Sequence, residues 1–283
     1  MKELREEYYP LVPKILCHYT KPCNLKSIVS GAGGKDKEIC FWANSNLCKN
    51  DTHELEFGKR IYDIVKQWLR DCNKEDYLYE IVNEKNSFSL SFTEGANPLE
   101  MIKKEYGSVR LEFDLSDCFN NMELMQCEYC EESEIGKYAE SLINEYKSLF
   151  DSIEMYNKAT TKPEFLIVPL VLKEYGLKRS TVEKIFFLKS KEEWGEEKEW
   201  RKVYDGENNT ILYHPNKVPY IEVYLPINCL KSIRLFNLDR IDPSKSSYRY
   251  KNEFEEYLAQ HKWDIPVIIE NLYMNRTQTN NLQ

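Results

Sequence analysis

The chain has few histidines and no long apolar run. Only four of its 283 residues are histidine, so a histidine in a patterned position is conspicuous. The longest uncharged apolar stretches, such as residues 165–172, are far shorter than the roughly 20 residues that cross a bilayer. The opening MKELREEYYP also lacks the apolar core of a signal peptide. We therefore expect a cytoplasmic protein with no membrane segment.

The chain also lacks a basic surplus and a cysteine framework. Its net charge of −8 argues against a broad basic face that binds duplex DNA. The net charge does not exclude a local basic groove. The nine cysteines are odd in number and have no framework spacing, which predicts reduced thiols. Cys127 and Cys130 form one C-x-x-C pair with no second pair close by, so we predict no metal site.

The patterns that are present alternate between strand and helix. Strand-like segments are expected at 14–19, 39–43, 87–94, 108–115, 165–172, 184–190, 199–204, 220–225 and 229–236, and helices at 24–30, 55–72, 98–106, 133–156 and 250–262. No linker rich in Gly, Ser or Pro divides them. The sequence predicts an α+β fold: one domain over residues 1–270, with a mixed, mostly antiparallel sheet, peripheral helices and a polar tail at 271–283.

Five short motifs stand in a fixed order along the chain. They are His18-Tyr19-Thr20 with the helix pattern Leu25, Ile28 and Gly31; Phe41-Trp42; Asn50-Asp51-Thr52-His53-Glu54; Phe92-Thr93-Glu94; and Glu199-Trp200-Arg201. This order resembles that of a bacterial family known as domain of unknown function 2971 over nearly the whole chain. The chain departs from the family at Met101-Ile102, where relatives usually carry Met-Trp, so an aromatic wall from that tryptophan is in doubt.

The opening block is also similar to that of the ADP-ribosyltransferase superfamily. The resemblance implies a split β-sheet core and a site for NAD, in which a first-strand histidine binds the nicotinamide ribose, an aromatic ring stacks on nicotinamide and a late-strand glutamate completes the site. It assigns NAD binding to His18, Tyr19, Trp42 and Arg201, and catalysis to Glu199. Fold likeness alone does not establish this function.

The chemistry of NAD cleavage explains these residue types. Breaking the nicotinamide–ribose bond creates an oxocarbenium-like centre, which a nearby carboxylate stabilises, while a neutral imidazole can hold the ribose by a hydrogen bond. The alternative for His18 is a bond to a backbone carbonyl. Because neighbours on a strand face opposite sides, we expect Tyr19 to pack inward if His18 faces a ligand. Only one of Phe41 and Trp42 can face the ligand, and Trp42 is preferred for its width.

Glu197 and Glu199 are two residues apart and would share one strand face. Glu197 belongs to an acidic run and is interpreted as solvated, whereas Glu199 begins the strand-like part and is the preferred site carboxylate. Arg201 could pair with Glu199 or with a diphosphate.

Three further residues are candidate substrate contacts: Asn50, Asp51 and Glu94. Asp51 fits a helix N-cap equally well, and Thr93-Glu94 a turn. His53 and His214 are expected at the surface.

These features predict an NAD-consuming ADP-ribosyltransferase-like protein acting on a protein or short nucleic-acid acceptor. A role as a toxin or in phage defence would add a neutralising partner protein. NAD glycohydrolysis, a non-enzymatic nucleotide- or partner-binding module, and removal of an RNA phosphate with NAD as acceptor are the alternatives.

Overall fold

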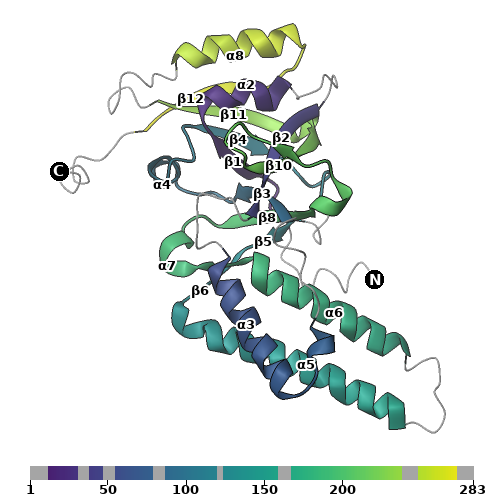
Figure 1. Cartoon of the computed structure of the whole chain (residues 1–283). Coiled ribbons are helices and arrows are strands. Elements are labelled where there is room, and N and C mark those ends of the chain that lie inside the picture. The colour runs from purple at the N-terminus through teal and green to yellow at the C-terminus, as the bar shows by residue number, and fades with distance from the viewer. Residues whose placement is uncertain are drawn as a thin grey trace.

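A computed structural model describes residues 12–30, 38–46, 55–78, 87–119, 124–158, 167–237 and 248–272. Figure 1 shows a β-sheet portion with helices α2 and α8 at one end and a bundle of α3, α5 and α6 at the other. The helices are α2 (Pro22–Ser30), α3 (Glu56–Asp71), α4 (Pro98–Lys103), α5 (Ile135–Lys158), α6 (Ile167–Phe186), α7 (Lys191–Trp194) and α8 (Tyr248–Gln260). None of the helices in these ranges is long and apolar enough to cross a membrane.

The main sheet follows the order β12-β11-β4-β1-β3-β2-β10-β9, with β8 paired to β3 and β5 paired to β8. Its strands are β1 (Leu16–Thr20), β2 (Glu38–Ser45), β3 (Ser87–Thr93), β4 (Val109–Phe113), β5 (Met125–Gln126), β8 (Glu199–Asp205), β9 (Leu212–Tyr213), β10 (Pro219–Pro226), β11 (Leu230–Asn237) and β12 (Val267–Asn271). A small second sheet pairs β6 (Glu128–Cys130) with β7 (Leu188–Ser190) in parallel. In the main sheet only β11 and β12 pair in parallel, among the pairings described. The predicted α+β fold with a mixed, mostly antiparallel sheet is confirmed.

Strand β3 is where the sheet divides. One edge of β3 pairs along its length with β8. The other edge is shared: Thr93 pairs with Cys17 of β1, while Ser89 pairs with Asn44 of β2. Ser91 lies between these two pairings, at the point where β1 and β2 diverge.

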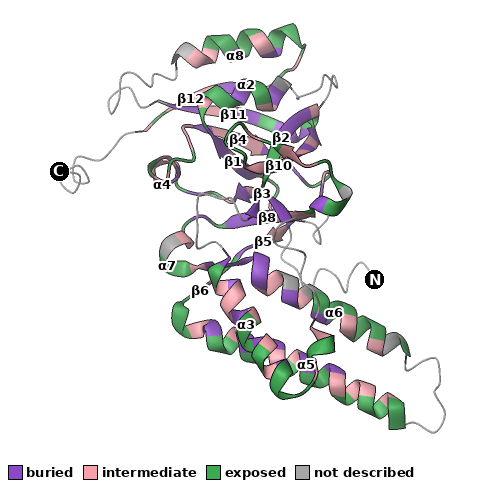
Figure 2. Ribbon diagram, viewed as in Figure 1, coloured by how far each residue is buried: buried purple, intermediate pink, exposed green. Residues whose placement is uncertain are grey.

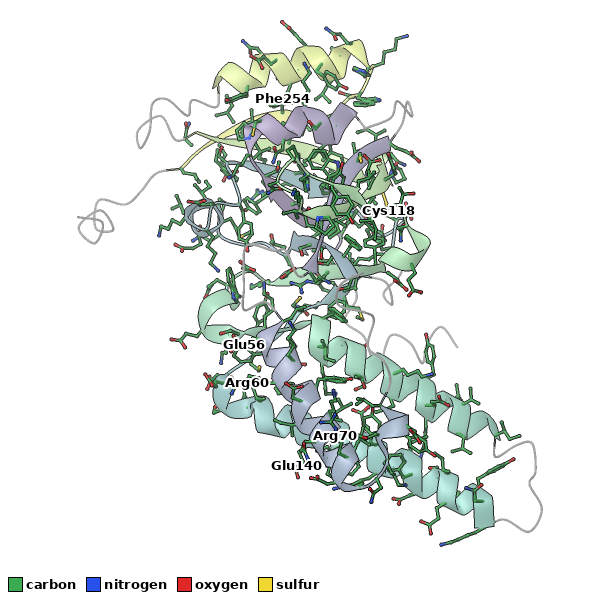
Figure 3. All side chains as sticks on the ribbon, in the orientation of Figure 1. Glu56, Arg60, Arg70, Cys118, Glu140 and Phe254 are labelled. Atoms are coloured by element: carbon green, nitrogen blue, oxygen red, sulfur yellow. A yellow bond between two sulfur atoms is a disulfide. The ribbon has the colours of Figure 1, made fainter. Side chains whose placement is uncertain are left out.

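The two faces of the sheet have different contents. One face carries Phe88, Leu90 and Phe92 into the largest apolar cluster, which also takes Leu25 from α2 and Phe254 from α8. Figure 2 shows this interior as largely buried, and Figure 3 labels Phe254 at its α8 side. The opposite face carries Ser87, Ser89, Ser91 and Thr93 toward the helix bundle.

The helix bundle has its own apolar core. Helix α3 buries Gly58, Ile61, Val65 and Leu69, which lie three or four residues apart on one face. A side chain at Gly58 would meet the backbone oxygen of Ile185 at 2.4 Å, so glycine at this position permits close packing of α3 on α6.

Two expectations from the sequence are wrong. Residues 165–172 were predicted as a strand, but residues from Ile167 onward belong to α6. A short apolar run does not distinguish the two structures, and Pro169 fits the first helical turn because the amide there needs no intrahelical partner. The prediction of reduced thiols fails for Cys118 and Cys229, which form a disulfide (Figure 3).

Candidate functional site

The predicted catalytic and ribose-binding residues lie on opposite faces of the sheet. Antiparallel register aligns Cys17 with Thr93, and Thr93 with Glu199, so these three side chains share a face. His18 follows Cys17 and therefore points to the other face. Ring contacts agree, because the His18 imidazole lies 4.9 Å from the Phe41 ring centroid, in the apolar core. The structure does not bring His18 and Glu199 together.

His18 sits at the division of the sheet. Its Nδ1 lies 3.0 Å from the carbonyl oxygen of Ser91, which can only accept, so this nitrogen carries the proton. The Phe92 ring is also near, at 6.1 Å. Burial lowers the pKa of His18, so the imidazole is neutral at pH 7. The alternative of a bond to a backbone carbonyl is confirmed, while a contact with NAD stays a prediction.

The aromatic candidates are also separated. Tyr19 is buried as expected for inward packing, donates its hydroxyl to the Ala96 carbonyl at 3.2 Å and stacks near Phe236. Trp42 is 42% exposed and lies 5.0 Å from the His214 ring, on the face opposite Phe41. The aromatic ring beside His18 is Phe41, not the preferred Trp42.

The remaining substrate-binding candidates have different outcomes. Asn50 and Asp51 lie outside the described residues, as does His53. Glu94 accepts a hydrogen bond from Trp200 Nε1 at 3.2 Å, which ties the end of β3 to β8.

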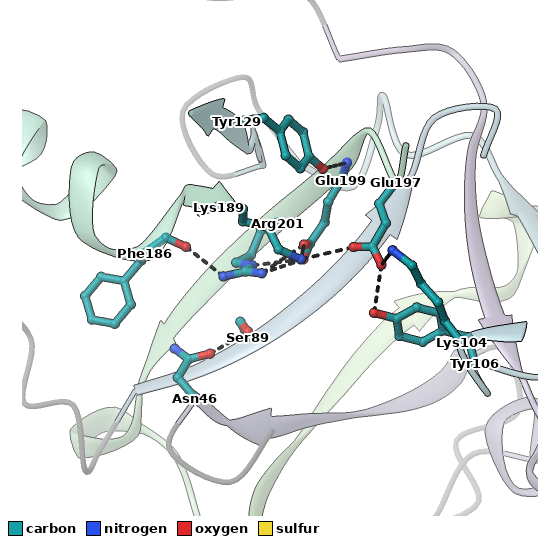
Figure 4. A network of polar contacts seen from close by, with 10 residues as sticks. All are labelled: Asn46, Ser89, Lys104, Tyr106, Tyr129, Phe186, Lys189, Glu197, Glu199 and Arg201. Carbon is teal, nitrogen blue, oxygen red and sulfur yellow. Dashed lines mark hydrogen bonds and ion pairs between the residues drawn. The ribbon is translucent and has the colours of Figure 1, made fainter. Parts of the chain in front are cut away.

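Glu199 belongs to a group of ionic and polar side chains that we call the ionic cluster: Lys104, Tyr106, Lys189, Glu197, Glu199 and Arg201 (Figure 4). Arg201 is fully buried and donates to both oxygens of Glu199 at 2.8–2.9 Å. Lys189 adds a bond to Glu199 at 2.8 Å. Arg201 also donates to the Phe186 carbonyl at 2.7 Å, which connects β8 to the last turn of α6. Both carboxylate oxygens of Glu199 are therefore held by the buried side chains of Arg201 and Lys189.

Glu197 is held by different partners. Lys189 donates to one of its oxygens at 3.0 Å, and the Tyr106 hydroxyl and Lys104 donate to the other at 2.9 and 3.3 Å. Lys104 is half-buried and Tyr106 is 37% exposed, so this end of the cluster reaches the surface. The Lys104 ammonium also lies 4.3 Å from the Trp194 ring. Glu197 is thus buried, but its partners Lys104 and Tyr106 are partly exposed to solvent.

The backbone between the two carboxylates is unusual. Lys198 has φ +46°, a left-handed conformation that costs about 1–2 kcal/mol for a residue other than glycine. Hydrogen bonds from Glu94 N to Lys198 O and from Cys127 N to Glu199 O hold this turn in place. As a result both carboxylates bind the single Lys189 ammonium. Strain of this kind concentrates at functional sites, which supports a functional interpretation of this turn.

A polar stripe continues from the cluster along β3. Asn46 donates to Ser87 at 3.1 Å and accepts from Ser89 at 2.6 Å. Thr93 faces the same way as Glu199, is buried, and its hydroxyl has no hydrogen-bond partner within the described ranges. A buried hydroxyl without a partner is unfavourable and can serve a ligand.

The two carboxylates of the ionic cluster face three cations, Lys104, Lys189 and Arg201. Burial raises the pKa of Tyr106 and keeps its hydroxyl protonated, so this hydroxyl donates to Glu197. Each carboxylate is thus held by buried or partly buried donors.

Comparison with known proteins gives no relative. No family matches the chain, and neither a curated protein nor a solved structure is detectably similar to it.

The sequence interpretation missed Lys104, Tyr106 and Lys189, and set Glu197 aside. Glu197 stands among other acidic residues, and its partners come from the turn that follows α4 and from β7. The spacing of Glu197 and Glu199 was the one available signal that both face one site.

Proposed function

We propose that this chain is an NAD-consuming protein of the ADP-ribosyltransferase type, whose reacting end is the ionic cluster and whose working carboxylate is Glu197. Two features support the proposal: the order of sequence motifs and the shared edge of β3 at which the sheet divides. The pairing of His18 with Glu199 that the resemblance implies does not support it, since these side chains face opposite ways.

The observation that carries the choice of Glu197 is the difference between the two carboxylates. Glu199 is locked by the buried Arg201, whereas Glu197 is held in part by Lys104 and Tyr106 at the surface. A diphosphate that pairs with Lys104 would withdraw one of the two donors to that oxygen of Glu197 and leave the Tyr106 hydroxyl bound. The Lys104 and Lys189 ammonium groups lie 4.3 and 4.8 Å from the Trp194 ring centroid, so this ring helps to hold both lysines beside Glu197.

The reaction then follows from these groups. As the bond from the nicotinamide nitrogen to the ribose carbon breaks, nicotinamide leaves with the bonding pair, and the Glu197 carboxylate stabilises the positive ribose carbon. An acceptor oxygen or nitrogen, or water, forms the new bond and gives up its proton. His18 satisfies the Ser91 carbonyl where β1 and β2 diverge.

The test is release of free nicotinamide from NAD by the full chain. Glu197→Gln should abolish release; because it also removes the charge that faces the buried Lys189, the melting temperature should fall by several degrees while the protein stays folded. Glu196→Gln, at the exposed neighbouring position, is the matched control and should keep full turnover. Full turnover in Glu197→Gln would remove this carboxylate from the reaction.

A second function, binding without turnover, is favoured by one observation: both carboxylates already have cationic partners. Calorimetry with ADP-ribose and with NAD separates the two functions. Binding of both ligands with no nicotinamide release establishes the binding module, and absence of binding ends both proposals.

A further inference from the structure

Trp42 forms an exposed aromatic surface on β2. Its neighbours Phe41 and Ala43 are buried in the core, while the indole faces outward and is 42% exposed. Its size is only partly used by packing, since the rings of His214 and Tyr220 lie beside it while 42% of the residue is exposed. Nothing in the proposed NAD chemistry uses it.

The indole is held in place on one side. The rings of Trp42, His214 and Tyr220 pack within 4.3–5.1 Å of one another, and His214 Nε2 lies 3.0 Å from Asn44 Oδ1. Burial lowers the pKa of His214, so this ring adds no positive charge at pH 7. A ring fixed before binding loses little conformational entropy when a ligand arrives.

A carboxylate lies directly across from the indole. Antiparallel register pairs Glu222 of β10 with Trp42, so both side chains leave the same face of the sheet. The Tyr224 hydroxyl donates to Glu222 at 2.5 Å and fixes the carboxylate. Glu222 is partly exposed and also borders a surface hollow of about 410 Å³.

Two basic residues lie near this surface. Lys202 borders the same hollow, but its ammonium rests over the Phe119 and Tyr204 rings, at 4.8 and 5.1 Å. Lys217 is exposed in the turn that follows His214.

We propose that Trp42 and Glu222 together recognise an arginine side chain exposed on a basic partner protein. A guanidinium is flat, stacks on an indole and pairs with a carboxylate through its planar fork, whereas an ammonium can do only part of this. The net charge of −8 also attracts a basic partner. The site is a surface rather than a cavity, which fits a protruding side chain and not an enclosed small molecule. This inference does not depend on the proposed NAD chemistry.

The test uses fluorescence anisotropy of labelled peptides with the full chain. The three peptides are Gly-Ser sequences with two arginines, with two lysines, and with two citrullines, which keep the shape of arginine without its charge. We expect the arginine peptide to bind at least fivefold more tightly than the lysine peptide, with the citrulline peptide weaker still. Equal binding of the arginine and lysine peptides would overturn the proposal, because it would indicate only an acidic surface.

Variants locate the binding. Glu222→Gln keeps an acceptor for Tyr224 and should weaken binding of the arginine peptide about tenfold. Trp42→Leu should weaken it by a similar factor, and Trp42→Phe by less. Glu140→Gln, on the exposed face of α5 (Figure 3), removes the same charge far from the site and should bind like the parent.

If Trp42→Leu lowers the melting temperature, its weaker binding could come from a change in folding. The binding of the arginine peptide by Glu222→Gln then decides whether the site exists. Parent-like binding by a folded Glu222→Gln protein would refute the site.

Discussion

The two faces of the sheet are built in contrasting ways. One face is dry and aromatic: Phe41, Phe92 and Phe113 meet edge to face with ring centroids 5.5–6.2 Å apart. The other face, toward the helix bundle, buries hydroxyls and the ionic cluster. Apolar burial stabilises the fold directly, whereas buried ion pairs regain through attraction roughly what they lose in hydration. The contrast teaches that the dry face maintains the fold and the polar face carries groups whose presence stability alone does not explain.

The largest effect is expected on the dry face. Phe92→Ala removes a fully buried ring and should lower the free energy of unfolding by about 3–5 kcal/mol. Ser91→Ala, the neighbour on the polar face, is the matched control and should change it by less than about 1 kcal/mol. Urea unfolding curves measure both. Equal losses would show that the faces do not differ.

A loss of about 3–5 kcal/mol, at or just below that of Phe92→Ala, is expected for Arg201→Met. It leaves the buried Glu199 with Lys189 but without its guanidinium, and loss of one partner of a buried pair costs about 3–5 kcal/mol. The double change Arg201→Met with Glu199→Met should recover much of this loss in the same unfolding experiment. Failure to recover would mean that the bond from Arg201 to the Phe186 carbonyl dominates.

A moderate effect concerns pH and His18. The folded state holds the pKa of His18 below its usual 6.5, because burial disfavours the charged ring. The unfolded chain therefore takes up a proton first, and stability falls as pH drops below about 6.5. In His18→Gln this fall in the free energy of unfolding below pH 6.5 should become smaller, and urea unfolding curves recorded at several pH values measure it. An unchanged pH profile would place the titrating group elsewhere.

The smallest effect is a gain. Thr93→Val replaces a buried hydroxyl without a described partner by a methyl group of similar size, and should raise the free energy of unfolding by about 1 kcal/mol. Thermal melting should shift upward by roughly 2–3 °C. A less stable variant would mean that the Thr93 hydroxyl has a hydrogen-bond partner in the folded protein.

The parts of the fold with clear periodicity could be predicted from the sequence. Alternation at 87–94 predicted β3, and apolar spacing at 133–156 predicted α5, because one face of each is buried along its length. The run at 165–172 could not be assigned, since apolar residues without polar alternation suit either structure.

The candidate site was less predictable. Alternation correctly implied that Phe41 and Trp42 face opposite ways, but not which of them faces His18. The same rule, applied across β1, β3 and β8, needs the pairing register, and only the folded structure supplies that register. Glu197 resembled its acidic neighbours because its cationic partners come from distant parts of the chain.

The Arg201 guanidinium, which reaches from Glu199 to the last turn of α6, has a practical consequence for dissecting the molecule. Removing the bundle would expose Arg201 and Glu199 to water, although both side chains are buried in the intact protein. It would also uncover Cys127, which packs beside Phe186. Helices and strands should thus be purified together, and activity sought only in the undivided polypeptide.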